Sequence, residues 1–398
     1  MKKIFLFLCL FLFQTAFSAN FLICRLAPGA DAKQIAVDYG LTLIDTTDPA
    51  PFVYYQVPDG VDPDLIQQDM LDDPRIIWAE EDQTVIMPEH IGAGKGTTIG
   101  VVGDSKTFYE ENKNVLQQIE YVPPSFLSSY NRRVRVAILD TGISPYQPIL
   151  LFRVVAKLNV VEPNEQPWDL PKNTDSDGDG EKDEGVGHGT MVAGIVAMLS
   201  PTTQLVVVRV ADSDGYSTAW RIIKGLAFAV INGAEVANVS LGSEQQVKAL
   251  SDVLDWTDEN GLVICAPVGN GNHEGADFPA RYSESICVTG VDPYDIKASF
   301  SNWDGTAESA APATGIVSFW WDGTMGIWSG TSFGSPFVVG ALAAGLSHIK
   351  PVLIPDVIRD IVNESGDNID GLNPNYEQKL GTRLNMRSLM LALKSAGG

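Results

Sequence analysis

Two hydrophobic patterns alternate along most of the chain. Strand-length runs that are almost wholly apolar are followed by longer segments in which apolar residues recur every three or four positions. Buried strands joined by helices are typical of a mostly parallel sheet covered by helices on both faces, so we predict an α/β fold. The predicted strands are 134–139, 205–210, 236–241, 262–266 and 286–291, and the predicted helices are 188–199, 218–231 and 247–256.

The pattern between residues 20 and 88 differs from the rest. Short strand and helix signals alternate there over 21–26, 31–39, 52–57, 63–71 and 76–82. This order predicts a small α+β domain. Residues 89–117 contain several glycines and then a charged stretch, which predicts a flexible linker. The larger domain is then expected over residues 118–398.

The first 18 residues have the layout of a secretory signal peptide. Lys2 and Lys3 precede an apolar run, and Ala16-Phe17-Ser18 follows it. We therefore expect a secreted protein, extracellular or periplasmic. The run is too short for a membrane anchor, and no later apolar stretch is long enough to span a bilayer.

Composition excludes one class of partner. A formal net charge of −23 argues against nucleic-acid binding, because phosphate contacts need clustered Lys and Arg.

Apart from Cys9 in the signal segment, the cysteines are Cys24, Cys265 and Cys287. Three cysteines define no disulfide framework, and a bridge between Cys265 and Cys287 stays open.

Ser332 is the candidate nucleophile. It lies in Gly330-Thr-Ser-Phe-Gly334, at the start of an apolar segment of helix length. A serine needs a histidine base. The same sequence also matches the Gly-x-Ser-x-Gly nucleophile elbow of α/β-hydrolases. In that fold the acid and then the histidine follow the serine in the chain. The only histidine after Ser332 is His348, within the same apolar segment, whereas Asp140 and His188 precede it.

Three segments in the order acid, histidine, serine resemble the subtilisin-like serine peptidases. They are Val134-Arg-Val-Ala-Ile-Leu-Asp140-Thr-Gly142, Gly187-His188-Gly189-Thr190 and the segment of Ser332. The resemblance implies that Asp140 orients His188 and that His188 takes the proton of Ser332. Ala266-Pro-Val-Gly-Asn270-Gly271 resembles the family segment whose asparagine stabilises the oxyanion, which would be Asn270.

The same resemblance implies a cleft that binds an extended polypeptide as an added strand. One edge would be Ser240, Leu241 and Gly242, the opposite edge Gly215 and Tyr216, and the pocket wall Pro267, Val268 and Gly269. The sequence shows no acid at this wall, so we expect an apolar or broad side-chain preference.

Residues 20–88 resemble the inhibitory propeptides of subtilases, which are ferredoxin-like. The resemblance rests on Arg25-Leu-Ala-Pro-Gly29, Gln56-Val-Pro-Asp-Gly60 and Asp73-Pro-Arg-Ile-Ile-Trp-Ala-Glu80. Family propeptides chaperone folding and occlude the cleft with their C-terminal tail. A precursor inhibited by its own propeptide, and processed within residues 89–117, is therefore expected.

An acidic loop resembles the start of a calcium loop. Acidic side chains alternate with other residues, and Gly180 takes the sixth position, but Val186 stands at the twelfth where a glutamate is usual. Ca²⁺ binding and a solvated acidic loop therefore both stay open. The candidate ligands are Asp175, Asp177, Asp179, Glu181 and Asp183.

These observations predict a secreted serine endopeptidase that works through an acyl-enzyme and is made as an inhibited precursor. One alternative is a catalytically silent, calcium-dependent binding protein on the same scaffold, although the presence of Asp140, His188, Asn270 and Ser332 argues against it. Another is an acyl hydrolase or acyl transferase that uses the same residues.

Overall fold

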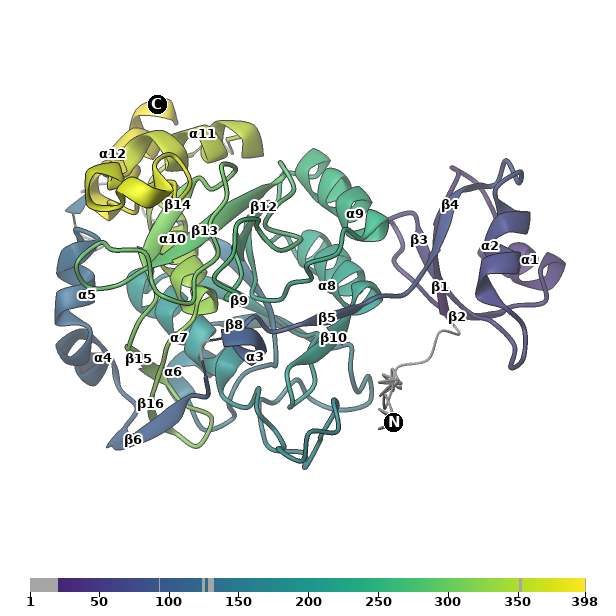
Figure 1. Cartoon of the computed structure of the whole chain (residues 1–398), viewed down its shortest axis with the longest axis horizontal. Helices are drawn as coiled ribbons and strands as arrows, with labels where there is room; N and C mark the ends of the chain where they lie inside the picture. Colours follow the sequence, from purple (N-terminus) through teal and green to yellow (C-terminus); the bar gives the residue numbers. More distant parts are fainter. Residues whose placement is uncertain (1–20, 93, 124–125, 128–131, 351–352, 398) are drawn as a thin grey trace, which may run out of the picture.

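The computed structural model describes residues 21–92, 94–123, 126–127, 132–350 and 353–397. The predicted signal peptide, residues 1–18, lies outside the described residues. Figure 1 shows a small N-terminal domain on one side of a much larger domain, with strand β5 (Thr84–Ile86) running from the first onto the second.

The small domain has the β-α-β-β-α-β order of a ferredoxin-like fold. Its four strands form an antiparallel sheet in the order β2-β3-β1-β4. Strand β2 was not predicted, because its residues are half exposed at the sheet edge and show no buried run. The elements are β1 (Phe21–Leu26), α1 (Ala32–Asp38), β2 (Thr42–Thr46), β3 (Phe52–Gln56), α2 (Pro63–Met70) and β4 (Ile76–Glu81).

The large domain is built on an eight-stranded sheet in the order β17-β14-β13-β12-β11-β7-β9-β8, and its strand pairs are parallel. The predicted α/β fold is therefore confirmed. The strands are β7 (Arg135–Asp140), β8 (Val154–Asn159), β9 (Gln204–Arg209), β11 (Val236–Val239), β12 (Val263–Pro267), β13 (Ser285–Val291), β14 (Ser309–Pro312) and β17 (Thr382–Arg383).

Helices α7 and α10 pack against each other, and α10 also contacts β11 to β14. Every residue of both helices is buried, which explains why their sequences are apolar all round. The helices of the large domain are α6 (Pro148–Leu151), α7 (His188–Leu199), α8 (Ala219–Ile231), α9 (Lys248–Glu259), α10 (Thr331–Leu346), α11 (Pro355–Ser365) and α12 (Met386–Ala396), with 3₁₀ turns at Asp370–Leu372 and Pro374–Tyr376.

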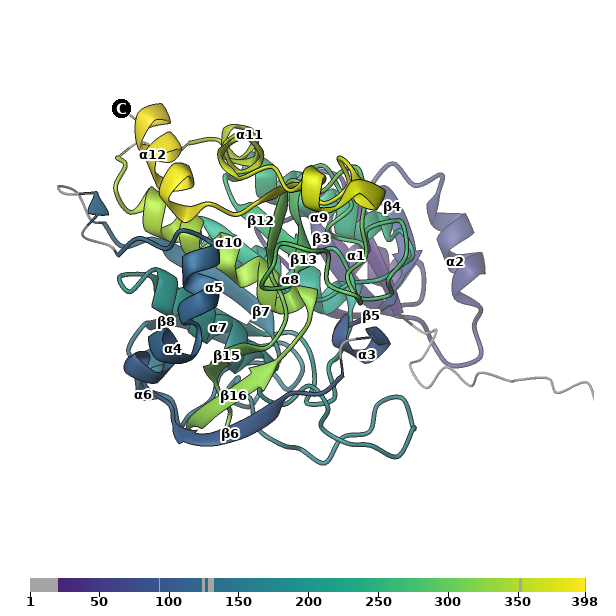
Figure 2. The same ribbon diagram turned by 60° about the vertical axis from the view of Figure 1, so that its left-hand side comes forward.

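Residues 89–117 differ from the flexible linker that their glycines predict. They form α3 (Glu89–Gly92), β6 (Thr97–Val102), α4 (Ser105–Glu111) and most of α5 (Lys113–Gln118). Strand β6 pairs with β16 (Thr324–Trp328), which also pairs with β15 (Ile316–Phe319), as Figure 2 shows. Phe108 and Leu116 are buried, so this segment is part of the large domain's packing.

Within the described residues, no helix has both the length and the apolar character needed to cross a membrane.

The two domains meet through charged and aromatic contacts. Asp252 of α9 accepts hydrogen bonds from Trp78 Nε1 and from Arg25 Nη1, the latter at 2.8 Å. The ring of Tyr54 stacks on Trp220 at a centroid distance of 4.8 Å. Asp252 is buried and bonded to two groups of the small domain, so it is one polar anchor of this interface.

We expect Asp252→Ala to destabilise the docked small domain, because Trp78 Nε1–H and Arg25 lose their acceptor. An unsatisfied buried donor costs about 1–3 kcal/mol. The measurement is urea unfolding of the full chain carrying Ser332→Ala. The exposed Asp255 of the same helix provides the control, and equal losses for Asp252→Ala and Asp255→Ala would contradict the assignment.

Candidate active site

Asp140, His188 and Ser332 come together although they are distant in the sequence. Asp140 ends β7, His188 is the first residue of α7, and Ser332 is the second residue of α10. Asp140 Oδ1 lies 2.7 Å from His188 Nδ1, and all three side chains are buried. The site thus forms beyond the carboxyl end of β7, the edge at which open α/β sheets bind ligands.

The glycines beside His188 let α7 begin close to the loop after β7. A Cβ on Gly189 would lie 2.4 Å from the carbonyl oxygen of Gly142, and Gly187 has a φ of +96°. The buried carboxylate of Asp169 accepts hydrogen bonds from the backbone N–H groups of Gly187 and Thr190. Asp169 was not found from the sequence, and it fixes the start of α7 and so the place of the imidazole.

Asn270 follows β12 and is oriented by the start of α10. Its Oδ1 accepts hydrogen bonds from the Thr331 backbone N–H at 3.0 Å and from Thr331 Oγ1 at 2.8 Å. Its Nδ2 is thereby turned toward the space in front of Ser332. The amide can donate to an oxygen there, the role that the sequence comparison with the family implied.

The side chain of Glu89 fills that space. Its Oε2 accepts a hydrogen bond from Ser332 Oγ at 2.8 Å and lies 3.3 Å from His188 Nε2, while its Oε1 accepts from Asn270 Nδ2 at 3.1 Å. A Cβ on Gly330 would lie 2.1 Å from Glu89 Oε1, so only glycine leaves room for the carboxylate. Sequence analysis missed Glu89, because the local sequence shows no partner for it.

Burial and neighbouring charges shift the pKa values of His188 and Glu89 in opposite directions. Burial disfavours the imidazolium, but the carboxylates of Asp140 and Glu89 outweigh it and raise the pKa of His188 to about 10. Burial also disfavours the charged carboxylate of Glu89, but His188 and the Ser332 hydroxyl outweigh it and lower the pKa of Glu89. Glu89 and His188 therefore form a buried ion pair, and a protonated His188 cannot act as a base.

The residues before Glu89 lie as an extended strand in the predicted cleft. Strand β5 pairs antiparallel with β10 (Tyr216–Thr218). On the side of β10, Met87 N–H also donates to the carbonyl of Gly215 at 3.1 Å. On the other side of β5, Ile86 exchanges backbone hydrogen bonds with Gly242, at 3.0 and 2.8 Å. Both edges expected to bind an extended polypeptide thus hold residues of this same chain. We call residues 84–92 the tail.

The other predicted cleft residues lie close by. Ser240 Oγ donates to the carbonyl of Ser332 at 3.3 Å, Leu241 is buried, and Pro267 and Val268 continue from β12 to Gly269. An acid is present at this wall, contrary to the expectation from the sequence. A Cβ on Gly269 would lie 2.3 Å from Asp277 Oδ2, and burial raises the pKa of Asp277 to about 6.

The acidic loop divides into two groups. Ligand atoms of Asp175, Asp177 and Asp179 lie within 4.8 Å of one another. Glu181 instead pairs with Lys95 at 3.0 Å. The carboxylate of Asp183 accepts hydrogen bonds from the backbone of residues 172–174 and from a serine hydroxyl. The structure therefore gathers only the first three of the five predicted calcium ligands.

Comparison with known proteins gives one consistent family. The sequence model of the subtilase family matches residues 131–381. Thermitase from Thermoactinomyces vulgaris is 30% identical over 60% of this chain and 82% of its own length. The thermophilic serine proteinase of Bacillus sp. (strain AK1) is 30% identical over 65% of each chain.

A solved structure supports the fold. The crystal structure of fervidolysin from Fervidobacterium pennivorans, described as a keratinolytic enzyme related to subtilisin, aligns with a TM-score of 0.73. The alignment covers 94% of this chain and 61% of fervidolysin, at 18% identity. The chain thus spans about three fifths of fervidolysin and 65% of the Bacillus proteinase.

We expect tail docking to weaken as the pH rises. The pKa of His188 is raised from 6.5. The free energy by which protonated His188 stabilises the docked tail is therefore complete below about pH 6.5 and is lost as the pH approaches about 10. The pKa of Glu89 is lowered from 4.5, so the stabilisation of the docked tail by its ionised carboxylate is present above about pH 4.5 and is lost as the pH falls below it. Limited proteolysis of the tail, in the Ser332→Ala chain, should therefore be slowest near pH 5–6.5.

Glu89→Gln should abolish most of this dependence, because no carboxylate is left to hold the proton on His188. Asp59→Asn, an exposed carboxylate of the small domain, serves as the control. The imidazole signals of His188 in NMR spectra report its pKa directly. A pH profile that is the same with and without Glu89 would contradict the ion pair.

Proposed function

Because the chain belongs to the subtilase family of serine peptidases, we propose that it is a secreted endopeptidase made as an inhibited precursor. The observation that carries the proposal is the arrangement around Ser332. The hydroxyl of Ser332 and the amide of Asn270 both donate to one carboxylate, and the His188 imidazole is bonded to Asp140 behind it. The signal-peptide pattern of residues 1–18 supports export.

In the proposed reaction, a polypeptide takes the place of the tail between Gly242 and Gly215. His188 accepts the proton of Ser332 Oγ as the oxygen attacks the scissile carbonyl, and Asp140 stabilises the imidazolium. Asn270 Nδ2 donates to the oxygen that becomes negative. His188 then protonates the leaving amine, and water releases the acyl group by the same steps in reverse.

The tail supports the proposal of a precursor held inactive by its own N-terminal region. It occupies both edges of the cleft, and its Glu89 accepts a hydrogen bond from Asn270 Nδ2, the donor that would stabilise the oxyanion. A side-chain carboxylate, and not a peptide carbonyl, accepts the Ser332 hydroxyl's hydrogen bond. The docked tail is therefore an inhibitor in this arrangement, and Glu89 has to leave before a bond within residues 89–117 is cut.

We also propose that the acidic loop binds Ca²⁺ through Asp175, Asp177 and Asp179. Carboxylate oxygens are the ligands that Ca²⁺ prefers. Each of these side chains accepts a hydrogen bond from a nearby backbone N–H through Oδ1. One ligand atom from each carboxylate lies within 4.8 Å of the others, and this convergence of oxygens fits a hard cation.

Calcium should stabilise the chain. We expect a chelator to lower the melting temperature, since a ligand at about 100 times its Kd adds about 2.7 kcal/mol. Replacement of Asp175 and Asp179 by Asn, with Asp177 kept, should remove the chelator's effect. Adding Ca²⁺ back after chelation is the control. If the chelator leaves melting unchanged, the loop is only a solvated acidic surface.

The catalytic assignment is tested with a fluorophosphonate that labels activated serines. Once matured, the wild type should be labelled and should cleave polypeptides, and Ser332→Ala should do neither. Asn270→Ala should still be labelled but should lower kcat about 10²–10³-fold with little change in KM, a magnitude that comes from a subtilisin itself.

Two outcomes would count against this function. A higher KM at unchanged kcat for Asn270→Ala would make Asn270 a substrate-binding residue and not an oxyanion donor. Labelling without peptide cleavage, across a mixed peptide library analysed by mass spectrometry, would favour an acyl hydrolase or transferase acting on other substrates.

A further inference from the structure

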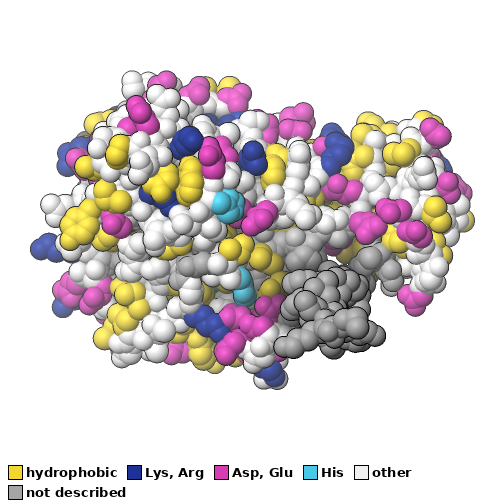
Figure 3. Space-filling model, viewed as in Figure 1, with side chains coloured by type: hydrophobic (Ala, Val, Ile, Leu, Met, Phe, Trp, Pro, Cys, Tyr) yellow, Lys and Arg dark blue, Asp and Glu magenta, His cyan; other side chains and the backbone are white. Residues whose placement is uncertain are grey.

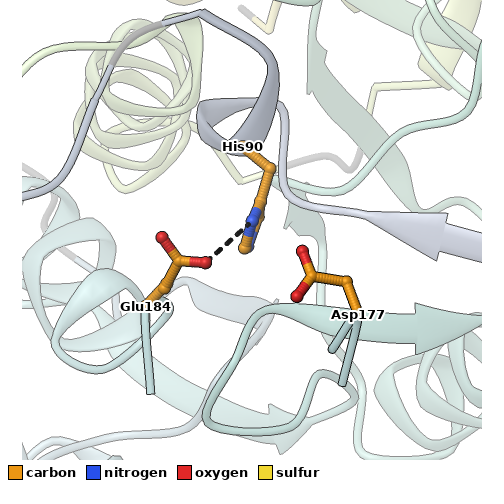
Figure 4. Close-up of side chains that lie close together, drawn as sticks. All are labelled: His90, Asp177 and Glu184. Carbon is orange, nitrogen blue, oxygen red and sulfur yellow. Dashed lines mark ion pairs between the residues drawn. The ribbon is translucent and has the colours of Figure 1, made fainter. Parts of the chain in front are cut away.

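A second group of side chains lies beside the catalytic residues and comes from two segments of the chain, the tail and the acidic loop. His90 follows Glu89 directly in α3, whereas Asp177 and Glu184 come from the acidic loop of the large domain. One ligand atom from each lies within 4.8 Å of the others. Figure 4 shows the imidazole of His90 between the two carboxylates.

The imidazole of His90 is buried without full hydrogen bonding. Its side chain is 10% exposed, and its Nε2 has no hydrogen-bond partner among the described residues. Its Nδ1 lies 3.8 Å from Glu184 Oε2, too far for a hydrogen bond. Two ligands of one tetrahedral Zn²⁺ lie about 3.3 Å apart, so a small movement would bring both atoms onto one ion.

Neighbouring groups orient the two carboxylates. Tyr216 donates its hydroxyl hydrogen to Asp177 Oδ2 at 3.1 Å, and its ring packs edge-to-face with that of His90 at a centroid distance of 5.3 Å. Lys95 pairs with Glu184 Oε1 at 2.7 Å and leaves Oε2 toward His90. A pocket of about 280 Å³, lined in part by His90, Lys95 and Glu184, adjoins two of the three side chains.

The surroundings carry net negative charge. Lys95 is the cation paired here, whereas Asp175, Asp179 and Glu181 lie on the same loop as Asp177 and Glu184. Figure 3 shows Asp and Glu side chains gathered beside a histidine and a basic side chain on this face. A divalent cation would offset this charge.

The donor set indicates the class of ion. One imidazole nitrogen with two carboxylate oxygens suits Zn²⁺ and related transition metals, whereas Ca²⁺ prefers oxygen ligands alone. We propose that His90, Asp177 and Glu184 bind one divalent transition-metal ion, for which Zn²⁺ is the probe, and that this ion fastens the tail to the large domain.

The position of His90 gives the ion its effect. Its neighbour Glu89 blocks Ser332, so an ion that holds His90 on the acidic loop also holds Glu89 in place. Only the docked chain presents all three ligands, and an ion that binds only the docked state stabilises that state. This regulatory role rests on the proposed function; the metal site itself does not.

Zn²⁺ binding is measured by calorimetry on the full chain carrying Ser332→Ala, which cannot cut itself. We expect one ion per chain, and a loss of affinity on the order of 10–100-fold or more with His90→Gln or Glu184→Gln. Asp59→Asn, which removes the same charge from an exposed side chain of the small domain, should leave Zn²⁺ affinity unchanged. Equal melting temperatures without metal verify that the variants fold.

The outcomes separate the site from its role. Zn²⁺ affinity unaffected by His90→Gln and Glu184→Gln would overturn the site. In the chain with Ser332 intact, the precursor should disappear more slowly when Zn²⁺ is present than when a chelator is present. His90→Gln should abolish this difference in rate. Maturation at the same rate with and without Zn²⁺ would overturn the fastening role. A chain that never cleaves itself would overturn the proposed function, while Zn²⁺ binding by the Ser332→Ala chain would still decide the site.

Discussion

One buried carboxylate holds the arrangement around Ser332 together. Glu89 is nearly inaccessible to water, and an ionised carboxylate in such a place is unfavourable unless charge and hydrogen bonds compensate it. The compensation comes from Ser332, Asn270 and protonated His188. Each of these groups also has a part in the proposed reaction, so the same atoms serve inhibition and catalysis, and they cannot do both at once.

This shared use explains why the rest of the tail is needed. A carboxylate on a free peptide would gain only local contacts, whereas Glu89 is held by a strand that pairs on both sides and by a folded domain anchored at Asp252. The orienting bonds of Asn270 and of the start of α7 are made within the large domain itself, so they do not depend on the tail. Because little has to be reordered on docking, most of the contact energy remains available for binding.

The sequence was informative where local patterns decide the structure. The apolar runs of β7, β9 and β12 are buried strands, and helix α7 spans the residues predicted for it, because burial on all sides requires an apolar sequence. Glu89 and His90 could not be found in this way. Their partners are distant in the sequence, and their own neighbours look like an ordinary turn. Strand β6 was missed for a related reason, because its exposed, glycine-containing sequence becomes a strand only by pairing with β16.

The separation of 243 residues between Glu89 and Ser332 has a consequence for biosynthesis. A ribosome makes the small domain and the tail first, and the helix that carries the nucleophile emerges much later, after most of the sheet. Domains generally fold as units, the N-terminal one first, and the blocking group is already part of the chain when the nucleophile is made. A competent serine therefore has no interval in the cell during which its blocking group has yet to be made.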